Sequence, residues 1–253
     1  MILSLAPVQR TISILILLLI LGACKKSSDR PCFKGTGDMI SEIRELGNFN
    51  SLQLYDFIDY DLIQDSSNKV VVHCGENLSS FVTTELENGV LTIKDDNSCH
   101  WLRSLPVKIK VDVHFTHLSN IRSESAGTIQ TLRPIIQENI VFDNYHSAAT
   151  IYLQVDAQEA TIRLSAGGPL CEVEGEAGHV FLRNSGSGKL IADELITNSA
   201  WVDNKDNGEI RTSVNGGPLW YLIDGHGDIY YRGEASEMLE VSRLGEGELI
   251  PLD

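Results

Sequence analysis

Aliphatic residues recur along the second half of the chain at an almost constant spacing of 19 to 20 positions. One series consists of Ile151, Leu170, Leu190, Ile210, Ile229 and Leu249. A second series runs between its members and consists of Ile162, Leu182, Val202, Leu222 and Val241. Two interleaved series with one period predict a solenoid, in which each coil stacks on the previous coil and buries the aliphatic side chains.

A small residue stands two positions before each member of the first series. These residues are Ala149, Gly168, Gly188, Gly208, Gly227 and Gly247. We expect them to form turns that reach a positive φ and that stack without side-chain collision. Ile129 extends the first series, but its gap of 22 positions to Ile151 predicts a bulge or a longer loop in that coil.

The chain before residue 118 carries strand signals without this period. Apolar or alternating stretches predict strands at 52–55, 57–63, 69–74, 81–86, 90–94 and 106–115. Asn88-Gly89 between two of these stretches predicts a hairpin turn. Residues 76–84 are the best candidate for a short helix and compete with a strand that begins at Phe81.

The fold class that follows is all-β, a right-handed parallel β-helix or solenoid with coils of about 20 residues and a β-rich N-terminal portion. The β-rich portion covers residues 36–117, and the coils cover residues 118–253 of the same domain. Parallel strands lie about 4.8 Å apart, and a right-handed connection between them is strongly favoured.

The N-terminus has the pattern of an export signal. An apolar run at 11–21 follows Arg10 and leads into Leu21-Gly22-Ala23-Cys24. The run is shorter than the roughly 20 residues that span a bilayer, and its ending resembles a lipobox, whose cysteine is acylated after cleavage. We therefore expect a lipoprotein signal peptide at 1–23, a lipid on Cys24 and a tether at 24–35. An ordinary secretory signal with an incidental cysteine is the alternative.

The charge balance limits the partners. The chain has 35 acidic and 20 basic residues and a net charge of −15. Nucleic acid is not an expected partner, because binding to phosphates needs a basic face. We expect the protein to meet the membrane through its lipid anchor.

Four cysteines remain besides Cys24, and they are Cys32, Cys74, Cys99 and Cys171. An exported protein meets an oxidising compartment, so pairing is allowed, with three possible connectivities. Cys32 in the irregular lead-in and Cys99 in a polar loop are placed where a bridge would tie the start of the chain to its body. They form the candidate disulfide, and Cys171 is interpreted as a small strand residue.

The predicted register also assigns the faces of the strands. Period-2 alternation places one aromatic residue from each of three coils outward, namely Phe181, Trp201 and Tyr221. Exposed aromatic rings mark contact surfaces, so this column is a candidate binding surface for a glycan or a protein. Tyr230 and Tyr231 form a second candidate patch. The alternative is that the rings brace the sheet, as cross-strand aromatic residues do.

Two further columns follow from the same register. One lies inside and contains Val180, Ala200 and Trp220. The other lies at the following bend and contains Asn184, Asn204 and Asp224. We expect a structural ladder of hydrogen bonds for the second column, because Asn and Asp commonly serve turns.

Enzymatic residues are hard to find in this pattern. Glycoside hydrolysis needs two carboxyl groups about 5 to 10 Å apart, and Asp203 with Asp224, or Asp193 with Glu194, could supply them. Acidic residues occur along the whole chain, however, which is typical of a solvated surface. The histidines do not converge as three metal ligands, and no phosphate loop is complete. We predict no catalytic residues, no metal and no cofactor.

Several segments together resemble a known family. They are Glu42-Ile43-Arg44, Phe49, Gly75-Glu76-Asn77-Leu78, residues 84–93, residues 97–101 and residues 227–233. Over about residues 33–250 their order is similar to that of the autotransporter-adhesin family with a head GIN domain. This resemblance implies a β-helix-like domain on an exported lipoprotein and brings no catalytic residues with it. Cys74 departs from the small residue expected before Gly75, which leaves the disulfide pairing open.

These observations together predict a lipid-anchored protein of the cell envelope. We expect it at the outer membrane of a Gram-negative bacterium, facing the periplasm or the cell surface. Its solenoid would present a surface for adhesion to a glycan or a surface protein. Two alternatives are a polysaccharide-degrading enzyme on a β-helix scaffold and a purely structural component of the envelope.

Overall fold

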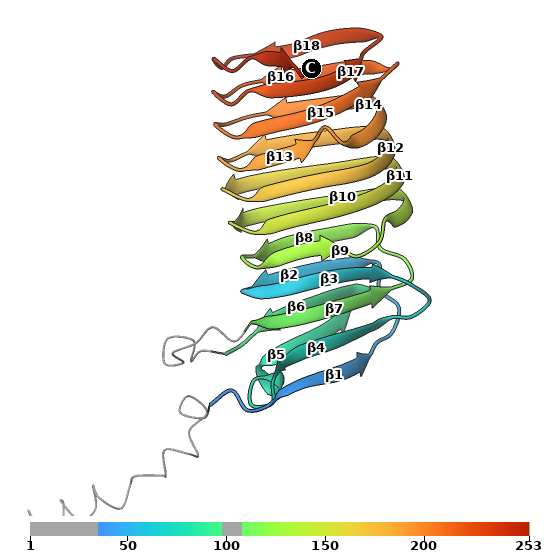
Figure 1. Ribbon diagram of the computed structural model, residues 1–253, viewed down its shortest axis with the longest axis vertical. Coiled ribbons are helices and arrows are strands. Elements are labelled where there is room, and N and C mark those ends of the chain that lie inside the picture. Colours follow the sequence, from blue (N-terminus) through green and yellow to red (C-terminus); the bar gives the residue numbers. More distant parts are fainter. Residues whose placement is uncertain (1–34, 98–107, 253) are drawn as a thin grey trace, which may run out of the picture.

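A computed structural model describes residues 35–97 and 108–252. Within these residues the strands are stacked in a tall, flattened spiral, with the early strands at one end and the last strands at the other (Figure 1). The first half contains β1 (Met39–Glu45), β2 (Ser51–Asp56), β3 (Ile58–Gln64), β4 (Lys69–Gly75), the 3-10 helix η3 (Ser79–Phe81), β5 (Val82–Glu87), β6 (Val90–Asp95) and β7 (Ile109–Phe115).

The remaining strands form the upper part of the spiral. They are β8 (Asn120–Ser125), β9 (Thr128–Thr131), β10 (Ile135–Ser147), β11 (Thr150–Gly167), β12 (Leu170–Ser185), β13 (Lys189–Ala192), β14 (Leu195–Asn204), β15 (Glu209–Asn215), β16 (Pro218–Ile223), β17 (Ile229–Glu234), β18 (Glu237–Arg243) and β19 (Leu249–Pro251).

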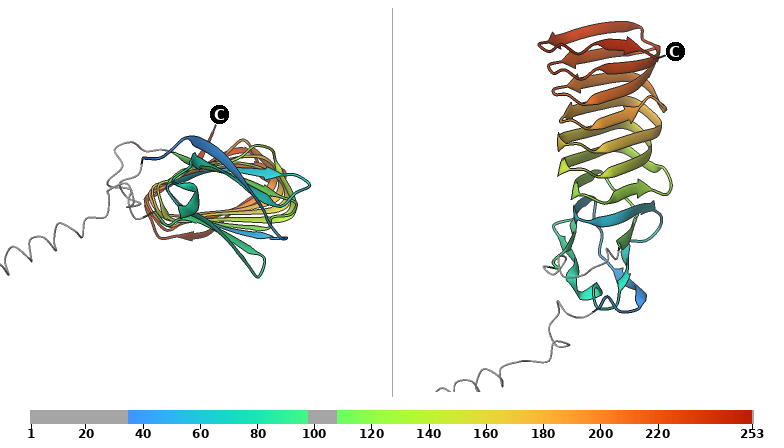
Figure 2. Two further views of the ribbon diagram at one scale, coloured as in Figure 1. Left: turned by 90° about the horizontal axis from the view of Figure 1, so that it is seen from below. Right: turned by 60° about the vertical axis from the view of Figure 1, so that its left-hand side comes forward.

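Parallel pairing builds two broad faces. Face A contains β6, β2, β8, the later parts of β10 to β12, and then β14, β16 and β18. Face B contains β7, β3, β9, the early parts of β11 and β12, and then β13, β15, β17 and β19. Seen along the long axis, the coils superimpose as a flattened ring (Figure 2). The predicted all-β solenoid is confirmed.

The spiral begins earlier in the sequence than its periodic part. The coil formed by β2 and β3 lies between β6 and β7 below and β8 and β9 above. Ser51, for example, pairs with Val90 on one side and with Asn120 on the other. Residues 51–64 are therefore part of the stack, although they lack the period of the later coils.

A small antiparallel head closes the lower end of this stack. Strand β4 pairs with both β1 and β7, and β5 pairs with β6. The predicted hairpin at Asn88-Gly89 is confirmed, with φ of 51° and 78° at these two residues. The competing interpretations of 76–84 both hold in part, because η3 is followed directly by β5.

The predicted first series is wrong at one position. Cys171, which is fully buried, pairs with Ile151 below and Leu190 above, whereas Leu170 pairs with Thr150 and is half-buried. The coil from Ile151 to Cys171 is thus one residue longer than the coil that follows it. Spacing alone could not choose between two adjacent residues that are both apolar.

Glycine is needed at these turns because successive turns stack closely, and not because the backbone adopts a positive φ. Gly188 and Gly208 do not have positive φ, contrary to expectation. A Cβ atom at Gly188 would lie 2.5 Å from the carbonyl oxygen of Pro169, and one at Gly208 would lie 2.4 Å from that of Gly188. The backbones of successive turns therefore approach so closely that only glycine fits.

The asparagine column holds these turns in place. Asn184 Nδ2 donates to the Gly188 carbonyl at 2.8 Å, and Asn204 Nδ2 donates to the carbonyls of Gly208 at 2.7 Å and Gly227 at 2.9 Å. The side chains thus bind turn backbone rather than one another. Asp224 does not belong to this column, because Ile223 is the partner of Asn204.

Within residues 35–97 and 108–252, no helix has the length and apolar character needed to cross a membrane. Cys74 and Cys171 are both buried free thiols. Burial raises the pKa of each thiol above its usual range.

Candidate functional site

Three aromatic residues lie one above another on the outer side of face A, in β12, β14 and β16. They are Phe181, Trp201 and Trp220, which we call the aromatic column. The predicted third member, Tyr221, is wrong. It pairs with Val202 and packs against the core, and its hydroxyl donates to Glu240 Oε2 at 3.1 Å.

The predicted inner column is wrong at the same point. Leu219, and not Trp220, follows Ala200 inside the coils. The coil that leads from Trp201 to Trp220 is one residue shorter than the coil before it, so the assumption of a constant length shifted every assignment in β16 by one position. The repetition of tryptophan close to this spacing was the signal in the sequence that could have located Trp220.

Trp201 and Trp220 form a stacked pair. Their ring centroids are 6.0 Å apart, and their planes are inclined by 27°. Both side chains are half-buried, so part of each ring faces the solvent. Offset stacking of this kind stabilises both rings in one orientation, which presents a fixed aromatic surface on the outside of the coils.

Polar groups border this pair on one side. The ring of His179 meets Trp220 edge-on, with the centroids 6.1 Å apart and an angle of 73°. His179 Nδ1 is 2.9 Å from Ser199 Oγ in the neighbouring coil. The imidazole is thereby fixed next to the tryptophan pair, where its second nitrogen can hydrogen-bond a ligand.

An ion network lies next to Phe181, the third member of the aromatic column. Arg183 lies over the ring of Phe181, with Cζ 5.2 Å from the centroid, and its Nε donates to Asp203 Oδ2 at 2.8 Å. Lys205 Nζ lies 3.3 Å from Asp203 Oδ1 and 2.9 Å from Asp224 Oδ2. The hydrogen bond to Asp224 raises the pKa of Lys205. Hydrogen bonds from Ser242 and Lys205 lower the pKa of Asp224.

The carboxyl pairs considered for catalysis take part in ion pairs. Asp203 is only 2 % exposed and is held by Arg183 and Lys205. Arg232 contacts both Asp193 at 3.3 Å and Glu194 at 2.5 Å. A general acid needs a raised pKa, whereas the pKa of Asp224 is lowered. This arrangement favours a structural role for these carboxylates.

The two residues of the second candidate patch, Tyr230 and Tyr231, point to opposite faces of β17. Tyr230 faces outward on face B, where Arg211 Cζ lies 5.6 Å from the ring centroid. Tyr231 packs against the core. The two side chains therefore do not form one surface.

The predicted lipidation site and the predicted disulfide involve three cysteines. Cys24, Cys32 and Cys99 lie outside the described residues. In the described part of the chain, no group of three or more His, Cys, Asp or Glu side chains is arranged to hold a metal ion.

Comparison with protein families gives one decisive match. Residues 48–235 match the family described as "Putative auto-transporter adhesin, head GIN domain". The chain belongs to this family. The match covers the head, apart from β1, and all coils up to β17. No curated protein matches the sequence.

Solved structures of similar proteins show the same fold. A "putative adhesin" from Bacteroides fragilis has a TM-score of 0.78 at 16 % identity, covering 85 % of this family member and 97 % of that chain. A "putative adhesin" from Parabacteroides distasonis has a TM-score of 0.65 at 19 % identity, covering 86 % and 98 %. A "putative lipid binding protein" from the same species has a TM-score of 0.65 at 16 % identity, covering 87 % and 98 %.

Proposed function

We propose that this protein is an exported, lipid-anchored adhesin-like protein of the cell envelope that binds a glycan on its aromatic column. The stacked pair of Trp201 and Trp220 on the outer side of face A is the observation that carries this proposal. Family membership supports an adhesin-like role. The sequence of residues 1–24 supports export, lipidation at Cys24 and a place at the outer membrane.

A sugar ring suits the surroundings of the tryptophan pair. Aromatic rings offer a large, rigid apolar surface, on which the C–H face of a pyranose can rest. The sugar hydroxyls need hydrogen-bonding groups at the border, and His179 and Ser199 supply them there. The net charge of −15 favours a neutral glycan over an anionic one.

The direction of the chain supports this role. Strand β1 lies at the end of the molecule where the head is, and the coils extend away from it (Figure 1). A lipid on Cys24 would therefore hold the head closest to the membrane. The aromatic column, in β12, β14 and β16, would then project away from the membrane toward a ligand.

A glycan array tests the binding function. We expect the protein to bind at least one neutral glycan, and Trp201→Ala and Trp220→Ala to weaken this binding at least tenfold, as for central aromatic residues of an interface. Tyr152→Ala is the matched control, because Tyr152 is an exposed aromatic residue on face B. Unchanged binding by both tryptophan variants would refute the proposal. Capture of a surface protein by the column, with no glycan bound, would also refute it.

The anchor and location need a separate test. In cells, Cys24→Ser should release the protein from the membrane fraction. Protease treatment of intact cells then distinguishes the two orientations, because only a surface-exposed chain is cleaved. Membrane retention of the Cys24→Ser variant would contradict lipid anchoring at this residue.

A further inference from the structure

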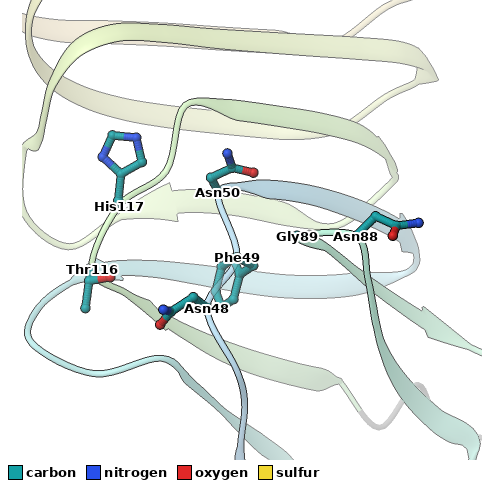
Figure 3. Close-up of a pocket in the computed structure, with 7 residues that line it drawn as sticks. All are labelled: Asn48, Phe49, Asn50, Asn88, Gly89, Thr116 and His117. Atoms are coloured by element: carbon teal, nitrogen blue, oxygen red, sulfur yellow. The ribbon is translucent and has the colours of Figure 1, made fainter.

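A polar cleft lies where the head meets the coils, on the same molecule but away from β12, β14 and β16. It has a volume of about 390 Å³, within the range of about 300 to 1,000 Å³ that is typical of small-molecule sites. Its walls come from the chain between β1 and β2, from the β5–β6 hairpin turn and from the chain between β7 and β8 (Figure 3).

The lining of this cleft is unusual for so acidic a protein. It contains no Asp, Glu, Lys or Arg side chain. Three asparagines, Asn48, Asn50 and Asn88, provide most of its polar groups, together with Thr116 and His117. Thr116 and His117 lie at one end, Asn88 at the other, and Asn50 between them (Figure 3).

Hydrogen bonds with Asn68 hold two of the lining residues, Asn48 and Thr116, in place. Asn68 Nδ2 donates to Asn48 Oδ1 at 2.9 Å, and Asn68 Oδ1 accepts a bond from the backbone N–H of Thr116 at 3.1 Å. The Thr116 hydroxyl also donates to Asn68 Oδ1 at 3.4 Å. The amide N–H groups of Asn48 therefore remain available to donate hydrogen bonds to a ligand. The hydroxyl oxygen of Thr116 can still accept one.

Backbone hydrogen bonds connect the middle of the cleft with its other two walls. The N–H groups of Asn50 and Ser51 donate to the Gly89 carbonyl at 3.0 Å and 3.2 Å, and the N–H of Ser119 donates to the Asn50 carbonyl at 2.9 Å. These bonds join all three walls. Gly89 has a φ of 78°, which residues with a side chain rarely adopt, so the turn beside the Asn50 amide favours glycine.

We propose that this cleft binds one neutral pyranose unit of a glycan. Amides and hydroxyls both donate and accept hydrogen bonds, which matches the neighbouring hydroxyl groups of a sugar. Apart from His117, the lining has no side chain that can carry a charge, so it provides no permanent counter-charge for an anion or a cation. The open shape fits a terminal residue or a branch of a longer chain. This site does not depend on the aromatic column.

Saturation-transfer NMR on the full protein, purified in a detergent without a sugar headgroup, tests the proposal. The probes are the methyl pyranosides of glucose, galactose and mannose, with methyl β-D-glucuronide as the anionic comparison. We expect at least one neutral probe to bind the wild type. Asn48→Ala and Asn88→Gly should each weaken binding about fivefold through lost hydrogen bonds. Glycine tolerates the φ of 51° at position 88, so this variant keeps the turn.

The Trp201→Ala variant separates this proposal from the previous one. Binding that persists in Trp201→Ala and weakens in the cleft variants supports the cleft, whether or not the aromatic column binds a glycan. Three results would overturn the proposal: no binding of any neutral probe, unchanged binding in Asn48→Ala and Asn88→Gly, or tighter binding of the glucuronide. If Asn48→Ala fails to fold, as judged by circular dichroism, Asn88→Gly decides alone.

Discussion

Trp201 and Trp220 stack on each other from consecutive coils, with 6.0 Å between their ring centroids. Two indole rings this close couple electronically, so the far-ultraviolet circular dichroism should contain an exciton contribution from the pair. We expect this contribution to disappear in Trp201→Phe and in Trp220→Phe and to persist in Tyr221→Phe. An unchanged spectrum in both tryptophan variants would contradict the register of β14 and β16.

Gly188 should tolerate no side chain. A Cβ atom there would lie 2.5 Å from the Pro169 carbonyl oxygen. Gly188→Val should therefore lower the free energy of unfolding by about 1 to 3 kcal/mol or more. Gly168→Ala is the control, because its new Cβ would meet only Ser187 Oγ at 3.4 Å. Thermal unfolding checks both variants, and equal melting temperatures would contradict the close stacking of these turns.

Asn204 should be a sensitive member of the asparagine column. It is fully buried and donates to the carbonyls of two turns. Replacement by alanine leaves these carbonyls without their partner, which costs about 1 to 3 kcal/mol. Urea unfolding measures the loss. The nearby exposed Asn207 serves as control, and Asn207→Ala should leave the stability nearly unchanged.

Asp65 should make stability depend on pH in the acid range. Burial opposes its charged form, but hydrogen bonds from His114 and Ser67 outweigh this and lower its pKa from 3.8 to about 2. The lowered pKa stabilises the folded state above about pH 4, and this contribution is lost as the pH falls toward 2.

The comparison of wild type with Asp65→Asn isolates this effect. The wild type should be the more stable protein at pH 6, and the difference should shrink between pH 4 and pH 2. Asp156→Asn, which changes an exposed carboxyl group, is the control. A difference between wild type and Asp65→Asn that is constant down to pH 2 would contradict the assignment.

Cys74 and Cys171 should resist alkylation in the folded protein. Both are fully buried, and burial raises the pKa of each thiol. Since the thiolate is the reactive form, iodoacetamide at pH 8 should modify them only after unfolding. Peptide mapping by mass spectrometry checks this, and rapid modification of either residue under native conditions would show that its part of the core opens.

The periodic pattern of the sequence predicted the type of fold because every coil repeats one structural unit. Leu190, Ile210 and Ile229 were placed correctly, and they pair with one another in successive coils. Leu170 and Tyr221 were misplaced, because successive coils differ in length by one residue. A shift of one residue along a strand exchanges the inward-facing and the outward-facing side chains. The position of β2 and β3 inside the stack could not be predicted, because their partners in β8 and β9 lie far along the chain and follow no period.

The candidate sites show the same limit. Two of the three residues of the aromatic column, Phe181 and Trp201, were predicted from the sequence. The ion network of Arg183, Asp203 and Lys205 was not predicted. The polar cleft brings together residues near positions 49, 88 and 117. Nothing in the sequence connects these segments, because their proximity arises only from the pairing of β2 with β6 and β8.

The enclosed coil of β2 and β3 determines when this protein can fold. A repetitive solenoid can add one coil at a time as the chain appears, but here the second coil in space is the first in sequence. The upper edge of β2 can pair only after β8 has been synthesised, because Ser51 pairs with Asn120. Such long-range pairing slows folding. As the chain is synthesised from its N-terminus, about half of it must therefore emerge before the coils above β2 and β3 can begin to form in order.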